Sequence, residues 1–134
     1  MIYLLDTNVC VQYLRGRNPS VLKRLQSTAP QDVQLCSVVK AELFLGVLRS
    51  AKPKENRAKV DAFVRPYVIL GFDDAAAEIH AQIRHQLETA GTPIGPYDLQ
   101  IAAIALGSGL TLVTHNTAEF SRVPGLTIED WEKP

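Results

Sequence analysis

Three carboxylate side chains stand at positions where a folded chain could use them together. Asp6 follows the apolar run Ile-Tyr-Leu-Leu at 2–5, Glu42 lies about one turn into a predicted helix, and Asp98 lies in the first turn of another. Like charges brought together repel, and such a cluster either shifts its pKa values or recruits a cation. Oxygen ligands without a His or Cys cluster favour Mg²⁺ or Mn²⁺ over structural zinc. These ions activate water and stabilise charge on a phosphate during in-line displacement.

Each carboxylate also has an ordinary structural explanation. Asp6 fits a helix N-cap, Glu42 fits the polar face of an amphipathic helix, and Asp98 fits the negative charge that a helix dipole favours in its first turn. Asp98 is the most informative, because the residues from Leu99 to Ile104 are mostly apolar. An ionised carboxylate is costly in apolar surroundings unless it is paired or bound to a cation. The three together therefore indicate a metal site more strongly than any one of them does.

Short apolar runs alternate with helical patterns along the chain. The runs that predict strands are 2–5, 33–36, 67–70, 110–114 and 126–128. The segments that predict helices are 9–14, 20–26, 38–49 with Ser37 as its cap, 54–64, 74–90 with Asp73 as its cap, 97–106, and a short turn at 117–120. This alternation predicts an α/β fold, with a central, mostly parallel sheet of four to five strands and about seven helices on both faces. Because active sites of such sheets lie beyond the carboxyl ends of the strands, we expect the three carboxylates at one edge.

The composition limits what kind of protein this is. With 134 residues, of which 46% are hydrophobic, the chain fits a single domain over 1–134 and can build a core. Its apolar runs are far shorter than the ~20 residues that cross a bilayer, and residues 1–14 lack the basic start of a signal peptide. Cys10 and Cys36 stand singly and predict buried free thiols. These features predict a cytoplasmic protein without a membrane segment.

The net charge of zero, from 14 basic and 14 acidic residues, conceals an asymmetry. Residues 15–65 carry 11 basic and 4 acidic side chains, whereas residues 66–134 carry 3 basic and 9 acidic ones. A basic flank beside an acidic metal pocket suits a nuclease, because the cations hold the phosphate backbone while the metal offsets repulsion from the carboxylates. The candidate phosphate contacts are Arg49, Lys52, Lys54, Arg57 and Lys59. Solvation of an exposed helix face is the alternative explanation for the same residues.

Six short blocks run from one end of the chain to the other. They are Leu-Leu-Asp-Thr-Asn at 4–8, Ser-Val-Val-Lys-Ala-Glu-Leu at 37–43, Gly-Thr-Pro-Ile-Gly-Pro-Tyr-Asp at 91–98, Ile-Ala-Ala at 101–103, Leu-Val-Thr-His-Asn at 112–116 and Ile-Glu-Asp-Trp at 128–131. In this order the chain resembles the PIN-domain ribonucleases, and specifically the VapC-type toxins of bacterial toxin–antitoxin pairs. The block at 91–98 is similar to the enterobacterial-type branch, whose members resemble nucleases of the initiator-tRNA anticodon loop.

The resemblance implies a three-layer PIN-like fold and Mg²⁺- or Mn²⁺-dependent endonucleolytic cleavage of RNA, with initiator tRNA as the favoured substrate. It implies that Asp6, Glu42 and Asp98 form the acidic metal site. The commonest pattern of the family has a fourth acid where this chain has Asn116. An amide can ligate a metal through its oxygen or orient a water, so we count Asn116 among the candidate catalytic residues.

Further polar residues stand close to these motifs. Thr7 and Ser37 could bond to a metal-bound water or to a neighbouring carboxylate, although helix capping explains both equally well. Glu119, about one helical turn after Asn116, could supply the missing charge, but we favour an ordinary exposed helix carboxylate there. His115 could contact RNA, and a role as general base is unnecessary if a metal activates the water.

The resemblance also implies partners. A small VapB-type antitoxin would lie across the toxin surface, with helix 38–49 and the early helices as docking surfaces, and the toxin would form a homodimer or a higher toxin–antitoxin assembly. Two rival functions stay open. A non-catalytic PIN-like module that binds RNA or protein usually lacks the acidic residues. A signalling receiver domain would need an acidic pair after the first strand and a lysine late in the chain.

Overall fold

The computed structural model describes all 134 residues and contains one five-stranded parallel sheet. Its strands are β1 (Tyr3–Leu5), β2 (Val33–Cys36), β3 (Val68–Leu70), β4 (Thr111–Val113) and β5 (Ile128–Glu129). Their order across the sheet is β3-β2-β1-β4-β5, and each neighbouring pair is parallel. The parallel sheet that the alternating sequence pattern predicts is therefore confirmed.

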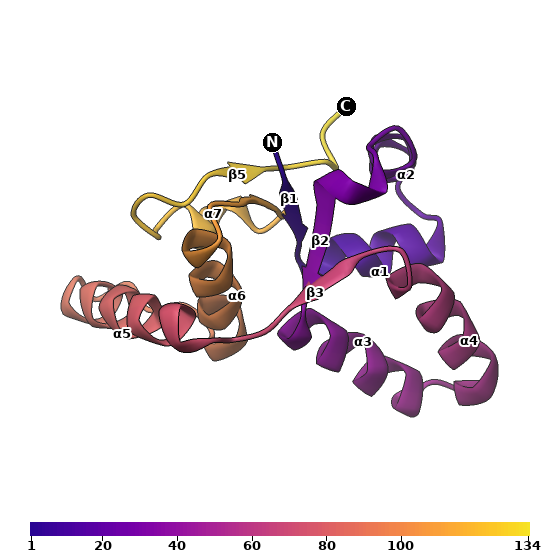
Figure 1. Ribbon diagram of the computed structural model, residues 1–134, viewed down its shortest axis with the longest axis horizontal. Coiled ribbons are helices and arrows are strands. Elements are labelled where there is room, and N and C mark those ends of the chain that lie inside the picture. The colour runs from indigo at the N-terminus through magenta and orange to yellow at the C-terminus, as the bar shows by residue number, and fades with distance from the viewer.

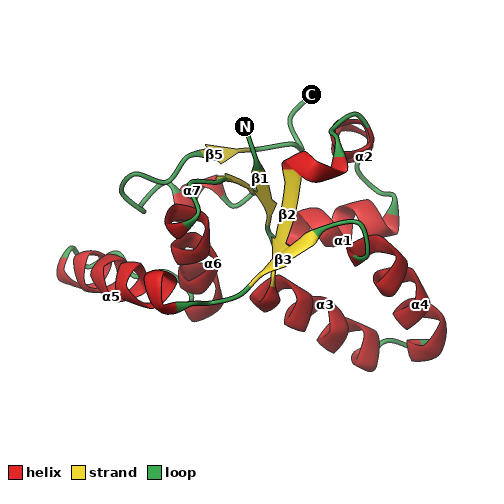
Figure 2. Ribbon diagram, in the orientation of Figure 1, coloured by secondary structure: helices red, strands yellow, loops and turns green.

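Seven α-helices and one 3-10 turn connect these strands. They are α1 (Thr7–Arg15), α2 (Pro19–Gln26), the turn Pro30–Asp32, α3 (Ser37–Arg49), α4 (Pro53–Val64), α5 (Asp74–Thr89), α6 (Pro96–Gly107) and α7 (Thr117–Phe120). Figure 1 shows α1 to α4 on one side of the sheet and α5 and α6 on the other, and Figure 2 shows the strands between these helical layers. Right-handed crossovers explain the division, because the chain first runs outwards from β1 to β3 and then returns to β4 and β5.

The core forms where both helical layers cover the sheet. Leu4, Leu35 and Leu112, from three adjacent strands, are fully buried, as expected for parallel strands covered on both faces. In α6 the continuous run from Ile101 to Ala105 is buried, as expected from the apolar character of this helix. Both cysteines are buried and free, as predicted. No helix of the structure combines the length and apolar character needed to cross a bilayer.

The boundaries of several elements differ from the sequence predictions. Three helices begin one residue earlier than predicted, at Pro19, Pro53 and Pro96, because proline fits the first helical position, where no amide hydrogen bond is lost. Helix α3 begins at Ser37 itself, with Cys36 as its N-cap and no side-chain cap. The predicted capping role of Ser37 is therefore wrong. The last strand, predicted at 126–128, lies at 128–129, where it pairs with β4.

Candidate active site

The strand order reverses between β1 and β4, and this reversal positions the candidate site. From β1 the chain proceeds to β2 on one side, whereas β4 is reached from β3 and leads to β5 on the other side. In open parallel sheets such a switch point opens a crevice beyond the carboxyl ends of the strands. Asp6 directly follows β1, and Thr114, His115 and Asn116 directly follow β4. The predicted edge of the sheet is thus where these polar groups gather.

Asp6 is both a helix cap and a buried charge. Its side chain accepts a hydrogen bond at Oδ1 from Val9 N, at 3.0 Å, and so caps α1. Asp6 is only 6% exposed. Burial raises the pKa of Asp6, and the charges of Glu132 and Glu42 raise it further. Hydrogen bonds with Thr114 and Val9 partly offset this rise in the pKa. The capping role therefore accounts for one carboxylate oxygen only.

Glu42 reaches the same region from α3. The Thr7 hydroxyl donates a hydrogen bond to Glu42 Oε1 at 2.8 Å, so the first residue of α1 holds the carboxylate of another helix. Of the alternatives predicted for Thr7, the structure has the bond to a neighbouring carboxylate. The negative charge of Glu42 raises the pKa of both Asp6 and Asp98. The three carboxylates that the sequence singled out therefore interact with one another.

Asp98 shares its surroundings with a fourth carboxylate, Glu119. Burial raises the pKa of Asp98 to about 7, and a hydrogen bond with Glu119 and the charge of Glu119 add to the rise. Glu119 Oε1 accepts a hydrogen bond from Gly95 N at 3.0 Å, and its Oε2 accepts one from Asn116 Nδ2, also at 3.0 Å. These donors lower the pKa of Glu119, so below about pH 7 Glu119 keeps its charge while Asp98 holds a proton. Glu119 is therefore not an ordinary exposed carboxylate, because it is hydrogen-bonded to Gly95 and Asn116 and interacts with Asp98.

The raised pKa of Asp98 predicts how the stability of the metal-free protein depends on pH. The pKa rises from 3.8 to about 7 on folding, so between these values the folded protein keeps a proton that the unfolded chain has lost. The resulting stabilisation is complete below pH 3.8 and is lost as the pH rises through about 7. The raised pKa of Asp6 acts in the same direction. Glu119 has a lowered pKa, so it is ionised in both states above about pH 5.5.

We therefore expect the free energy of unfolding of the metal-free protein to fall between about pH 5.5 and 7.5. The contribution of Asp98 should be on the order of 1 kcal/mol, because solvent screens this half-buried group. Urea denaturation in EDTA at several pH values measures the fall, with Asp98→Asn as the control. Equal pH dependence in the two proteins would contradict the assignment of the fall to Asp98.

The remaining predicted residues have varied surroundings. Ser37 lines a small pocket with Glu42 and makes no side-chain hydrogen bond to it. Arg57 bonds to Asp61 at 3.1 Å within α4, which fits the alternative of a solvated helix face. The basic residues that share a groove with Glu42 are Arg15, Arg17 and Lys59. Of these the sequence prediction named only Lys59.

The donor set of the candidate site fits a hard divalent cation. Asp6, Glu42 and Asp98 offer oxygen atoms, and Glu119 stands beside Asp98. Burial is the main cause of the raised pKa values of Asp6 and Asp98, and the charges of neighbouring carboxylates add to the rise. A cation would take the place of the proton that Asp98 holds. Carboxylate oxygens without nitrogen or sulfur ligands match the preference of Mg²⁺ and Mn²⁺.

Comparison with known proteins agrees with this fold. A family model for the PIN domain matches residues 3–126, and the chain is therefore a PIN-domain protein. Ribonuclease VapC2 of Rickettsia felis is 38% identical over 134 residues, covering 99% of this chain and 100% of the relative. The tRNA(fMet)-specific endonuclease VapC of Shigella flexneri is 40% identical over 129 residues, covering 96% of this chain and 97% of the relative.

Solved structures show the same similarity. The crystal structure of VapBC2 from Rickettsia felis, bound to a DNA fragment from its promoter, matches with a TM-score of 0.91 and 37% identity, covering 98% of this chain and 99% of that one. DNA-bound VapBC from Salmonella typhimurium also matches with a TM-score of 0.91 and 37% identity, covering 98% of each chain. The chain belongs to the VapC family of PIN-domain ribonucleases, the toxins of VapBC toxin–antitoxin systems.

Proposed function

We propose that this ribonuclease is an Mg²⁺- or Mn²⁺-dependent endonuclease that cleaves the anticodon loop of initiator tRNA and thereby inhibits translation. The observation that carries the proposal is the interacting set of Asp6, Glu42 and Asp98 at the switch point of the sheet. The choice of RNA is supported by two relatives named tRNA(fMet)-specific endonuclease VapC, at 40% and 37% identity. A non-catalytic PIN-like module would not need carboxylates that oppose one another's ionisation.

The residues of the site have distinct roles in the proposed reaction. Asp6, Glu42 and Asp98 hold the divalent ion, which when bound supplies charge stabilisation at the scissile phosphate and lowers the pKa of water. Thr7 fixes the rotamer of Glu42 through its 2.8 Å hydrogen bond. Binding of the ion would displace the proton that Asp98 holds below about pH 7, which would link metal binding to proton release. The expected products carry 5′-phosphate and 3′-hydroxyl ends.

Glu119 is proposed as the fourth carboxylate, and Asn116 as the residue that positions it. We expect Glu119→Gln to lower the rate of RNA cleavage by about 10²-fold, because it removes a charge next to Asp98. Asn116→Ala should cost about 10-fold, since Asn116 acts through its 3.0 Å hydrogen bond to Glu119. Single-turnover cleavage at a series of Mn²⁺ concentrations measures both. A larger loss in Asn116→Ala than in Glu119→Gln would show instead that the amide acts directly.

A basic groove leads away from the carboxylates. Arg15, Arg17 and Lys59 line it together with Glu42, and its volume is about 450 Å³. We propose that these cations, together with Arg49, Lys52 and Lys54 near the junction of α3 and α4, contact the RNA backbone. Such contacts would make binding of RNA strongly dependent on salt concentration. The divalent ion would offset the negative charge of the carboxylates where the groove meets the candidate active site.

The proposed partners are a VapB-type antitoxin and a second copy of the chain. Both similar crystal structures named above contain VapBC proteins, which supports a complex of this kind here. Leu45 and Leu48 of α3 are 44% and 74% exposed, and exposed apolar side chains of this kind mark a protein interface. We place the single domain over residues 1–134 in the cytoplasm, as a homodimer that the antitoxin joins into a larger assembly.

Incubation of the antitoxin-free protein with total bacterial tRNA tests the proposed function. The reactions contain Mg²⁺, Mn²⁺ or EDTA, and the cut is mapped by sequencing the RNA ends. We expect one metal-dependent cut in the anticodon loop of initiator tRNA, with a 5′-phosphate on the downstream fragment. A cut in another RNA would correct the substrate only. Absence of both cleavage and metal binding in folded protein would favour the non-catalytic module.

A further inference from the structure

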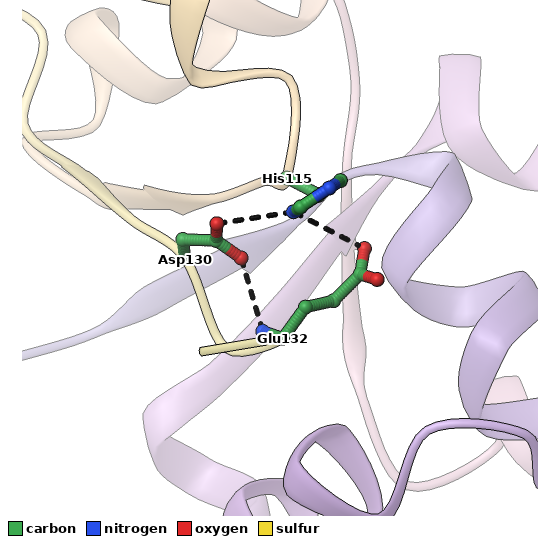
Figure 3. Close-up of side chains that lie close together, drawn as sticks. All are labelled: His115, Asp130 and Glu132. Atoms are coloured by element: carbon green, nitrogen blue, oxygen red, sulfur yellow. Dashed lines mark hydrogen bonds and ion pairs between the residues drawn. The ribbon is translucent and has the colours of Figure 1, made fainter. Parts of the chain in front are cut away.

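A second cluster of ionisable side chains lies where the C-terminal segment meets the end of β4. His115 Nδ1 lies 3.0 Å from Asp130 Oδ2 and 3.6 Å from Glu132 Oε2. Figure 3 shows both carboxylates directed at the imidazole from the chain that follows β5. We propose that His115, Asp130 and Glu132 form a separate site for a transition-metal ion of the Zn²⁺ class. This site is distinct in its donors from the carboxylate site described above.

The spacing of the donor atoms fits a single ion. Zinc binds imidazole nitrogen and carboxylate oxygen at about 2.0–2.2 Å, so neighbouring ligand atoms lie about 3.0–3.6 Å apart in octahedral or tetrahedral arrangements. Both separations from His115 Nδ1 fall within this range. One ligand atom from each of the three residues lies within 4.8 Å of the other two. An ion can therefore enter with small movements of the side chains.

The carboxylates are held in place by hydrogen bonds to their other oxygens. Asp130 Oδ1 accepts a hydrogen bond from Glu132 N at 3.0 Å, and Glu132 Oε1 accepts one from Asn18 Nδ2 at 3.3 Å. Asn18 is itself fixed, because its Oδ1 caps α2 by accepting a hydrogen bond from Val21 N at 3.1 Å. Each carboxylate thus presents its remaining oxygen to His115. Support of this kind around the ligands is typical of metal sites.

The charges of the cluster call for a cation. The side chains of Asp130 and Glu132 are only 7% and 18% exposed, and carboxylates withdrawn from water need a cationic partner. The imidazole of His115 is the basic group that pairs with them, whereas Arg24 pairs with Glu129 instead. Two carboxylates therefore face one imidazole. A divalent ion would balance the charge, and the 58% exposure of the imidazole leaves an open side for water ligands.

The donor set also selects the kind of ion. Imidazole nitrogen combined with carboxylate oxygen suits Zn²⁺, Co²⁺ and Mn²⁺, whereas Mg²⁺ prefers oxygen alone. The charge of Glu132 acts on Asp6, so the two sites adjoin. They share none of their proposed ligands, which are Asp6, Glu42 and Asp98 in one and the His115 cluster in the other. Each can therefore be disabled without altering the ligands of the other.

Calorimetric titration of metal-free Asp98→Asn protein with ZnCl₂ tests the inference while the carboxylate site is disabled. We expect one Zn²⁺ per chain. Adding His115→Ala should weaken the binding by at least about 10-fold, because one of three ligands is lost. Adding Asn18→Ser should weaken it by about 10-fold, since serine keeps the helix cap but cannot orient Glu132. The matched control is His85→Ala, which removes an exposed imidazole from α5 and should leave binding unchanged.

Cobalt provides a second measurement that does not depend on activity. Co²⁺ bound to His115 should give a visible absorption band in the Asp98→Asn protein, and this band should vanish with His115→Ala. Absence of zinc binding in Asp98→Asn, or binding that survives both His115→Ala and Asp130→Asn, would overturn the inference. So would variants that lower the melting temperature but leave zinc affinity unchanged, since the cluster would then be an ion pair that tethers the C-terminal segment. If His115→Ala does not fold, the zinc affinity of Asn18→Ser tests the inference, and an unchanged affinity would overturn it.

Discussion

Asp98→Asn should reduce RNA cleavage by at least about 10³-fold and, in the absence of metal, make the protein more stable. The loss of activity follows from the loss of a metal ligand, because metal-borne charge stabilisation of several kcal/mol corresponds to about three powers of ten in rate. The gain in stability follows from burial and from Glu119, which together raise the pKa of Asp98 to about 7. Above that pH the folded wild type must hold an ionised carboxylate in a half-buried position next to Glu119, which costs free energy. The neutral amide of the variant has no such cost.

Two measurements on the same preparations check this prediction. Cleavage of labelled tRNA in Mn²⁺ gives the rate, and thermal unfolding at pH 7.5 with EDTA or Mn²⁺ gives the stability. We expect an increase in unfolding free energy on the order of 1 kcal/mol without metal, after allowance for solvent screening. Mn²⁺ should raise the melting temperature of the wild type but not of the variant. Cleavage at the wild-type rate by Asp98→Asn would refute its role as a metal ligand.

Two substitutions of Asp6 should separate its two roles. Asp6→Asn and Asp6→Ala should both lower cleavage by about 10³-fold, because both remove a charged ligand. Asparagine still accepts the hydrogen bond from Val9 N that caps α1, whereas alanine cannot. We therefore expect Asp6→Ala to be less stable than Asp6→Asn by about 1 kcal/mol. Asp6→Asn should equal or exceed the wild type in stability without metal, since burial raises the pKa of the native carboxyl.

Chemical denaturation in EDTA and the cleavage assay distinguish the variants of Asp6. Thr7→Ser serves as a matched control, because serine keeps a hydroxyl that can donate to Glu42 and should retain most of the activity. Equal stability of Asp6→Asn and Asp6→Ala would show that the cap contributes little. Active Asp6→Asn protein would show that the carboxylate serves only as a cap. The two outcomes are independent, so each role can fail separately.

Local patterns explain most of what the sequence predicted correctly. The strands are short apolar runs bounded by caps and turns, and their alternation with helices leaves the parallel sheet as the arrangement that buries both faces. Helix starts were missed by one residue at Pro19, Pro53 and Pro96. The reason is that proline, although it interrupts the middle of a helix, is well suited to the first helical position. Signals of this kind were present in the sequence and could have corrected the boundaries.

The position of Glu119 shows what local patterns do not contain. Its hydrogen bond to Gly95 N joins residues 24 positions apart, and its contact with Asp98 depends on how the loop before α6 meets α7. On the sequence alone, Glu119 is a carboxylate on a short helix. The same holds for the three-residue cluster around His115, because Asp130 and Glu132 reach it only when β5 pairs beside β4.

The amino-acid sequence by itself determined the α/β fold, the family, and the three carboxylates Asp6, Glu42 and Asp98 as the candidate site. The sequence identifies these carboxylates because the end of a strand and the first turns of a helix are recognisable from local patterns. A parallel sheet then brings the carboxyl ends of its strands, and the residues that follow them, to one edge. Only the tertiary structure decided which other charges join them. Charges interact through space, over distances that chain separation does not reveal. The pairing of Glu119 with Asp98, and of Asp130 and Glu132 with His115, therefore emerged only from the folded chain.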